Sequence, residues 1–61
     1  MSVLVVGADA SAVQAEVARL RAKGRRVAGF VGDDEAAARA MADELLGPEA
    51  SLHFLDRRRD H

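Results

Sequence analysis

Two short apolar runs, each closed by a glycine and followed by a segment of helical periodicity, constrain the fold of this chain more than any other feature. Val3-Leu4-Val5-Val6 ends at Gly7, and Val27-Ala28-Gly29-Phe30-Val31 ends at Gly32. Neither run alternates apolar with polar residues, which is typical of parallel strands covered on both faces. A third run, Leu52-His53-Phe54-Leu55, follows later. The sequence therefore predicts an α/β fold with three parallel strands.

The segment between the first two runs has the pattern of an amphipathic helix, expected from Ser11 to Lys23. Its apolar positions fall at i, i+4 and i+7 on one face: Val13, Val17 and Leu20. Ser11 and Gln14 have the spacing of a capping box, which predicts Ser11 as the N-cap. Gly24 supplies a C-terminal stop.

A second helix is expected from Glu35 to Leu46. Its predicted core positions fall at i, i+3 and i+7: Ala38, Met41 and Leu45. Asp33 or Asp34 is the expected N-cap. Gly47-Pro48 ends the helix, because glycine tolerates the left-handed cap and proline cannot continue the helix.

These elements predict one domain, residues 1–61, with βαβαβ order. Right-handed crossovers that progress in one direction give the strand order 3-2-1, with both helices on the same face of the sheet. The other face then carries no helix, although the apolar runs of the strands predict burial on both faces. We therefore expect a second copy of the chain, a partner protein or the rest of a longer domain to cover that face.

The amino-acid composition argues against nucleic-acid, membrane and metal-binding functions. A chain of 61 residues buries a smaller fraction of its surface on folding than a larger domain does, and without cysteine it has no disulfide to add stability, so its fold is expected to be marginally stable. Nine basic and ten acidic residues leave a net charge of −1, and two phenylalanines are the whole aromatic content, so we expect no nucleic-acid partner. The apolar runs are too short to cross a membrane and no signal sequence is evident, so we expect a cytoplasmic protein. His53 and His61 have no companions at metal-ligand spacing, so no metal is expected.

At the first strand-to-helix turn, Val6-Gly7-Ala8-Asp9-Ala10-Ser11-Ala12-Val13 occupies the place of a glycine-rich dinucleotide loop. From there the chain resembles the opening of the short-chain dehydrogenase/reductase family, through Gly24-Arg25-Arg26-Val27-Ala28, the segment from Asp33 to Leu45, and Leu55-Asp56. The resemblance covers nearly the whole chain, but only the first three strands of that family. It implies a half-Rossmann unit and NAD or NADP as the cofactor.

The chain departs from that family at the positions that would hold the cofactor. The three glycines of the family's loop correspond to Gly7, Ser11 and Val13, so only the first is kept. Asp9 lies at the start of the predicted helix, where its carboxylate takes N–H groups that a phosphate would use and repels that phosphate. The ribose-binding acid of the family falls on Val31, with Asp33 as the nearest substitute.

The resemblance gives Asp56, followed by Arg57, the place of an aspartate that contacts adenine. The candidate cofactor-binding residues are therefore Gly7, Ala8, Asp9, Ser11, Gly32, Asp33, Asp56 and Arg57. The chain has no tyrosine, so it lacks a catalytic residue of the family and has no predicted catalytic site. Two hypotheses follow: weak or vestigial binding of NAD(P) or another nucleotide without catalysis, or a non-enzymatic module that self-associates or docks a partner on the uncovered sheet face.

Overall fold

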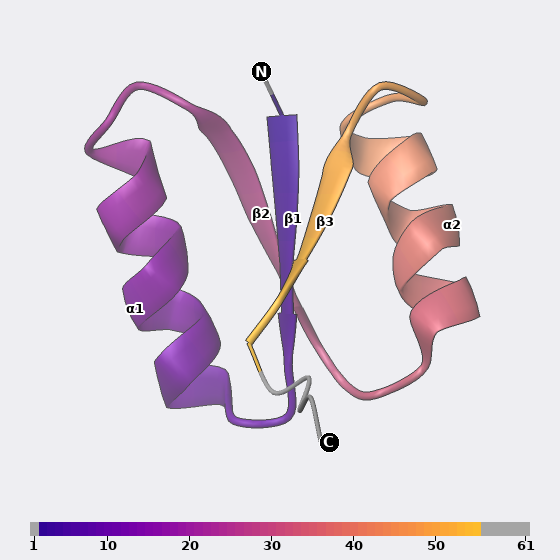
Figure 1. Ribbon diagram of the computed structural model, residues 1–61, viewed down its shortest axis with the longest axis horizontal. Coiled ribbons are helices and arrows are strands. Elements are labelled where there is room, and N and C mark those ends of the chain that lie inside the picture. Colours follow the sequence, from indigo (N-terminus) through magenta and orange to yellow (C-terminus); the bar gives the residue numbers. More distant parts are fainter. Residues whose placement is uncertain (1, 56–61) are drawn as a thin grey trace, which may run out of the picture.

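The computed structural model describes residues 2–55 and confirms an α/β fold with a three-stranded parallel sheet. The elements alternate along the chain: β1 (Ser2–Gly7), α1 (Ala10–Arg21), β2 (Arg26–Val31), α2 (Glu35–Leu45) and β3 (Ser51–Phe54). The carboxyl ends of the strands share the lower edge of the sheet in Figure 1. No helix within residues 2–55 is long and apolar enough to span a membrane.

The strand order is β2-β1-β3, so the predicted order 3-2-1 is wrong. β1 is central and pairs with β2 from Ser2↔Arg26 to Gly7↔Val31, and with β3 from Val3↔Ser51 to Val6↔Phe54. The connection from β2 to β3 therefore crosses β1, so that β3 pairs with the other edge of β1 and not with the outer edge of β2. This is the beginning of the second common doubly wound order, the flavodoxin-like order 2-1-3-4-5.

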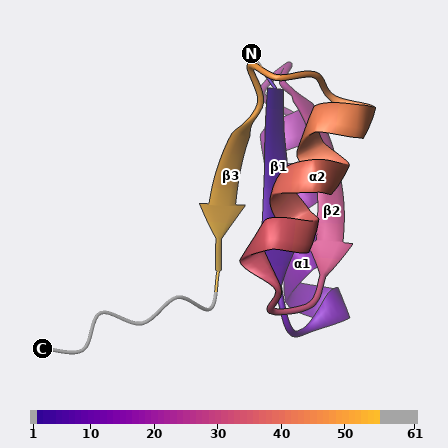
Figure 2. The ribbon, with the colours of Figure 1, turned by 90° about the vertical axis from the view of Figure 1, so that its right-hand side faces the viewer.

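The two helices lie on opposite faces of the sheet, which corrects the prediction that one face is bare. When crossovers are right-handed, reversing the direction of the second connection moves its helix to the other face. Figure 2 shows α2 in front of the sheet and α1 behind it. α1 packs over β1 and β2, and α2 packs over β1 and β3. Each face of the sheet therefore carries a helix of the chain itself, and no bare face requires a partner to cover it.

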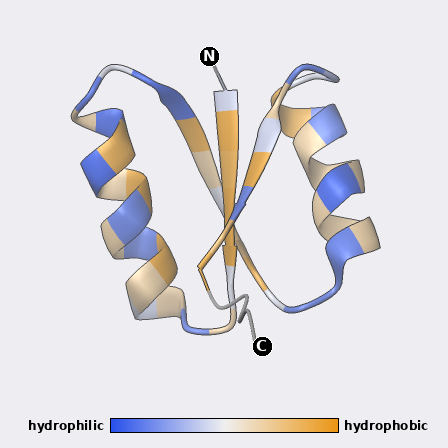
Figure 3. Ribbon diagram, viewed as in Figure 1, coloured by the Kyte–Doolittle hydropathy of each residue, from blue (hydrophilic) through white to orange (hydrophobic). Residues whose placement is uncertain are grey.

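Side chains of β1 alternate between two small cores. Val3 and Val5 pack with Val13 of α1 and Val27 of β2, whereas Leu4 and Val6 face α2. Figure 3 shows apolar residues along most of β1 and mixed polar and apolar residues along the helices. An apolar side chain buried from water stabilises a fold by about 1.5–3 kcal/mol, so this strand is the main source of hydrophobic stabilisation.

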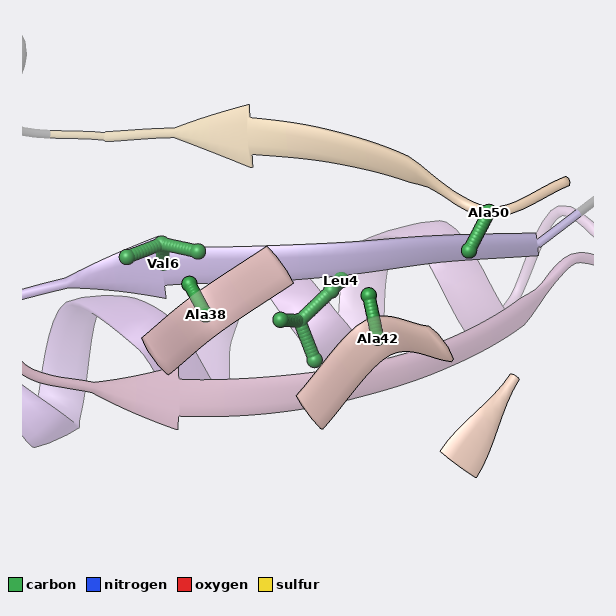
Figure 4. Packing of buried hydrophobic residues seen from close by; sticks show 5 residues of the cluster. All are labelled: Leu4, Val6, Ala38, Ala42 and Ala50. Atoms are coloured by element: carbon green, nitrogen blue, oxygen red, sulfur yellow. The ribbon is translucent and has the colours of Figure 1, made fainter. Parts of the chain in front are cut away.

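The core face of α2 differs from the prediction. Ala38 is fully buried as expected, but the second fully buried position is Ala42, while Met41 and Leu45 are 37% and 53% exposed. Figure 4 shows the methyl groups of Ala38 and Ala42 directed toward Leu4 and Val6. Small residues let this helix approach the sheet closely, and the larger side chains are displaced to its flank.

Aspartates begin both helices. Asp9 caps α1 through a hydrogen bond from the Ser11 N–H to Asp9 Oδ1 (3.2 Å), so the prediction of Ser11 as the N-cap is wrong. Asp34 caps α2, accepting from the Ala37 N–H at 3.2 Å, as expected for one of the two candidate caps. α2 is followed by Gly47 at φ +102°, a left-handed conformation that suits glycine.

Val13 of α1 is accommodated by glycines on the strands. A Cβ at Gly29 of β2 would lie 2.8 Å from Val13 Cγ1, and one at Gly7 would lie 3.0 Å from Val13 Cγ2. The dinucleotide loop of the resembling family places its last glycine on the helix to allow close helix–strand packing. Here the helix carries the side chain and β2 supplies the glycine.

Candidate functional site at the carboxyl edge of the sheet

A cavity of about 210 Å³ lies at the carboxyl edge of the sheet. β1 and its following loop contribute Val6, Gly7 and Ala8, and β3 contributes Phe54. The β2–α2 connection and the first residue of α2 complete it with Gly32, Asp33 and Glu35. In open α/β sheets the ligand site is the crevice outside the strand ends where the strand order reverses, which for order 2-1-3 lies between β1 and β3. The position of this cavity makes it the first candidate for a binding site.

Backbone pairing fixes the three strand ends that form the cavity. The ladder between β1 and β2 extends one residue past β2, because the Gly32 N–H donates to the Gly7 carbonyl at 2.9 Å. On the other side of β1, the Leu55 N–H donates to the Val6 carbonyl at 2.8 Å. The residues at the bottom of the cavity are therefore held by ladder hydrogen bonds on both sides of the central strand.

The cavity has an apolar floor and an acidic mouth. Val6 is buried and Phe54 is partly buried, whereas Asp33 is exposed. Glu35 adds a second carboxylate, and none of the residues from 2 to 55 that line the cavity is lysine or arginine. Ionised carboxylates accept hydrogen bonds and attract donors and cations, and they disfavour a phosphate in the same place.

The N-termini of both helices at this edge of the sheet are capped by aspartates. Asp9 accepts the Ser11 N–H, which confirms the expectation that its carboxylate occupies a donor that a bound phosphate would use. Asp34 does the same for α2. A helix N-terminus binds anions through its unpaired N–H groups and positive dipole, and an aspartate cap reduces both contributions.

The structure brings together four of the predicted cofactor-binding residues: Gly7, Ala8, Gly32 and Asp33. Asp9 and Ser11 lie beside the cavity at the start of α1 and do not line it. Asp56 and Arg57 lie outside the described residues. Asp33 lies in the connection between β2 and α2, two residues after the end of β2.

Three lining residues were not predicted: Val6, Glu35 and Phe54. The sequence carried a signal for each. Val6 and Phe54 are the last apolar residues of two strands, and the observed order pairs them directly. Glu35 begins the helix that follows the second strand, and a helix N-terminus in an α/β fold faces the carboxyl edge.

No group of three histidine, cysteine, aspartate or glutamate side chains within residues 2–55 is arranged to hold a metal ion. His53 lies in β3, and its side chain is about half exposed. Comparisons with protein-family models, curated proteins and solved structures find no match to this chain. The interpretation of the site therefore depends on its own geometry.

Proposed function

We propose that this chain is a weak nucleotide-binding module that holds the nucleoside end of an adenine nucleotide such as NAD(P), without catalysing a reaction on its own. The observation that carries the proposal is the cavity at the reversal between β1 and β3, with Asp33 at its mouth and Val6 and Phe54 at its floor. The base lies against the apolar floor, and the ribose hydroxyls donate to the Asp33 carboxylate.

The size and charge of the cavity support recognition of the nucleoside rather than of the whole cofactor. A volume of about 210 Å³ is below the roughly 300–1,000 Å³ of sites that enclose a complete small-molecule ligand. The phosphates extend into solvent, because Asp9 and Asp34 already occupy helix N–H groups at this edge. Affinity is consequently low, and NADPH binds more weakly than NADH because its 2′-phosphate meets the Asp33 carboxylate.

Titration of the protein into NADH, with cofactor fluorescence as the readout, tests the proposal, since the chain has no tryptophan to interfere. We expect saturable binding with a Kd of about 0.1–1 mM, and displacement by adenosine as effective as by AMP. Asp33→Asn keeps the shape of the side chain and weakens binding about tenfold, as expected on losing a charge-assisted hydrogen bond. Glu44→Gln, on the exposed surface of α2, is the matched control and leaves the Kd unchanged.

Two results would contradict the proposal. One is the absence of any fluorescence change when the protein is titrated to about 1 mM, the weakest expected Kd. The other is saturable binding that Asp33→Asn leaves unchanged, because the nucleotide would then lie elsewhere on the protein.

Self-association is the second candidate function, now without an uncovered face to support it. Within residues 2–55, β2 and β3 each pair only with β1, so each has an open edge that a second copy of the chain can extend. Val31 at the end of β2 is 54% exposed. An increase of Tm with protein concentration, together with a dimer in sedimentation equilibrium, is the expected result; a concentration-independent Tm would count against it.

A further inference from the structure

β2 forms one open edge of the sheet (Figure 2), because within residues 2–55 it pairs only with β1. The peptide groups of successive residues in a strand point to opposite sides of that strand. The Gly32 N–H donates to the Gly7 carbonyl, so the even-numbered positions of β2 face β1. The carbonyl of Val27 instead accepts from the Arg21 side chain at 3.0 Å, so the odd-numbered positions face outward. The N–H and carbonyl groups at the open edge are therefore those of three residues: Val27, Gly29 and Val31.

The space beside this edge is accessible to another strand. A groove of about 440 Å³ lies between α1 and the edge, and its lining includes Gly29 and Val31 of β2 and Val17 and Ala18 of α1. Gly29 carries no side chain and Val31 is 54% exposed, so an incoming strand meets an open backbone and an apolar side chain. β2 has six residues and β3, at the other edge, has four, so β2 offers the longer surface for pairing.

The two ends of β2 carry opposite charges. Arg26 is the first residue of the strand, Asp33 lies two residues after its end, and both are exposed. Within residues 2–55, neither of them forms an ion pair. When two copies of β2 pair antiparallel, the basic start of each copy meets the acidic end of the other. The edge is therefore complementary to itself, as a two-fold symmetric interface requires.

We propose that β2 pairs antiparallel with β2 of a second copy of the chain, about a two-fold axis at Gly29. This pairing rests on self-association, the second candidate function above, and specifies the surface that it uses. Gly29 faces its own counterpart, and Val27 faces Val31 of the second copy, each pair exchanging N–H and carbonyl hydrogen bonds. At both ends of the paired strands, Arg26 of one copy lies beside Asp33 of the other.

The joined sheet also has room for the helices. Side chains directly opposite in an antiparallel pair lie on the same face, so both copies of α1 cover one face of the joined sheet. Since α1 packs over β1 and β2, the two copies lie roughly two strand spacings, about 10 Å, apart, close to the usual distance between packed helices. The Val27 carbonyl bound by Arg21 has a second lone pair for the second copy. A charged side chain at the edge nevertheless keeps the association weak.

Sedimentation equilibrium of the whole chain measures the association, with interference optics because the chain has no tryptophan or tyrosine. We expect a monomer–dimer Kd of about 0.1–1 mM. Isotope-filtered nuclear magnetic resonance on a mixture of labelled and unlabelled chains then tests the register. The expected signal is a nuclear Overhauser effect between the Hα atoms of Ala28 in one copy and Phe30 in the other, because these residues form the closest pair that is not hydrogen-bonded.

Charge-reversal variants test the contacts at the two ends of β2. Arg26→Glu and Asp33→Arg each place like charges at both contacts and raise the dimer Kd about tenfold. An equimolar mixture of the two variants recovers the wild-type affinity, because each contact of the mixed dimer again joins opposite charges. Damage to the fold of either variant does not produce this recovery. Glu44→Gln, on the exposed surface of α2, is the control and leaves the Kd unchanged.

The possible failures separate this pairing from self-association in general. A protein that is still monomeric at about 3 mM, three times the weakest expected Kd, contradicts both. A dimer that lacks the signal between Ala28 and Phe30 overturns this pairing alone, since the copies then meet through another surface. A mixture of Arg26→Glu and Asp33→Arg that associates no more tightly than either variant by itself also overturns it.

Discussion

The contact between α1 and β2 can be tested by adding one methyl group at Gly29. The Cβ of Gly29→Ala would lie 2.8 Å from Val13 Cγ1 and 3.3 Å from Val17 Cγ2. Real Cβ atoms essentially never approach another heavy atom within 3.0 Å, so helix and strand must separate or Val13 must leave its position. Gly29 is not among the glycines with positive φ, so the substitution introduces this steric conflict without backbone strain.

The expected destabilisation follows from two opposing effects. Overpacking a core costs about 1–3 kcal/mol, and replacing a strand glycine by alanine returns about 0.5–1 kcal/mol of backbone entropy. The net loss is about 1–2 kcal/mol. A domain of this size has a free energy of unfolding of roughly 3–9 kcal/mol, so the loss is a large fraction of the total and lowers Tm measurably.

A double-mutant cycle with Val13→Ala separates the steric conflict from other effects. Val13→Ala alone removes two buried methyl groups and leaves a cavity, at a cost of about 2–3 kcal/mol. In the double variant the methyl group added by Gly29→Ala no longer meets the valine side chain, so the two costs are not additive and the coupling is about 1–2 kcal/mol in favour of the double variant. Urea unfolding followed by far-ultraviolet circular dichroism measures all four proteins. A neutral Gly29→Ala, or additive costs, would refute the packing of α1 on β2.

Three further perturbations test local features by the same unfolding assay. Asp34→Ala removes the α2 cap and destabilises the protein by about 1 kcal/mol, whereas Asp34→Asn, which keeps the cap, changes stability by much less. Gly47→Ala forces a Cβ into a left-handed turn and destabilises by about 1 kcal/mol, although no atom lies within 4 Å of that Cβ. Because Arg19 lowers the pKa of Glu16 below 4.5, the stabilisation from this pair is present above pH 4.5 and is lost as the pH falls through the lowered pKa. Glu16→Gln removes that part of the acid dependence, and an unchanged pH profile would contradict the assignment.

Local patterns in the sequence were sufficient for the elements and insufficient for their arrangement. Glycine-closed apolar runs and helical periodicity predicted every strand and helix to within a few residues of its observed bounds. No local sequence pattern predicts the direction of the connection from β2 to β3. That direction depends on which strand is stabilised most by burial at the centre of the sheet. The uninterrupted apolar run from Val3 to Val6 could have identified β1 as the central strand, because a central strand is covered on both faces along its length. β2 and β3 are less completely covered, since Gly29 and His53 are exposed.

The helix faces show a similar limit. Periodicity correctly placed Val13 in the core of α1, where it is 2% exposed. On α2 the periodicity predicted that Met41 and Leu45 are buried and missed Ala42, because large side chains contribute most to a hydrophobicity pattern. Ala42 is buried instead because α2 lies so close to β1 that a larger side chain does not fit between them. How closely a helix approaches a sheet is a tertiary property, and the spacing of apolar residues in the sequence does not predict it.

The strand order also decides whether this chain contains a site at all. In the predicted order 3-2-1, three strands progress in one direction, and the reversal that opens a ligand crevice requires a fourth strand beside β1. In the observed order the reversal lies between β1 and β3, so the crevice is bounded by residues already present in the described chain. Residues other than glycine at positions 11 and 13, together with Asp9, disfavour a phosphate at the start of α1. None of these residues lines the pocket that contains Val6, Phe54 and Asp33. A search for ligands should therefore begin with nucleosides and other uncharged or cationic groups, and phosphate-rich cofactors should bind no better than their nucleoside parts.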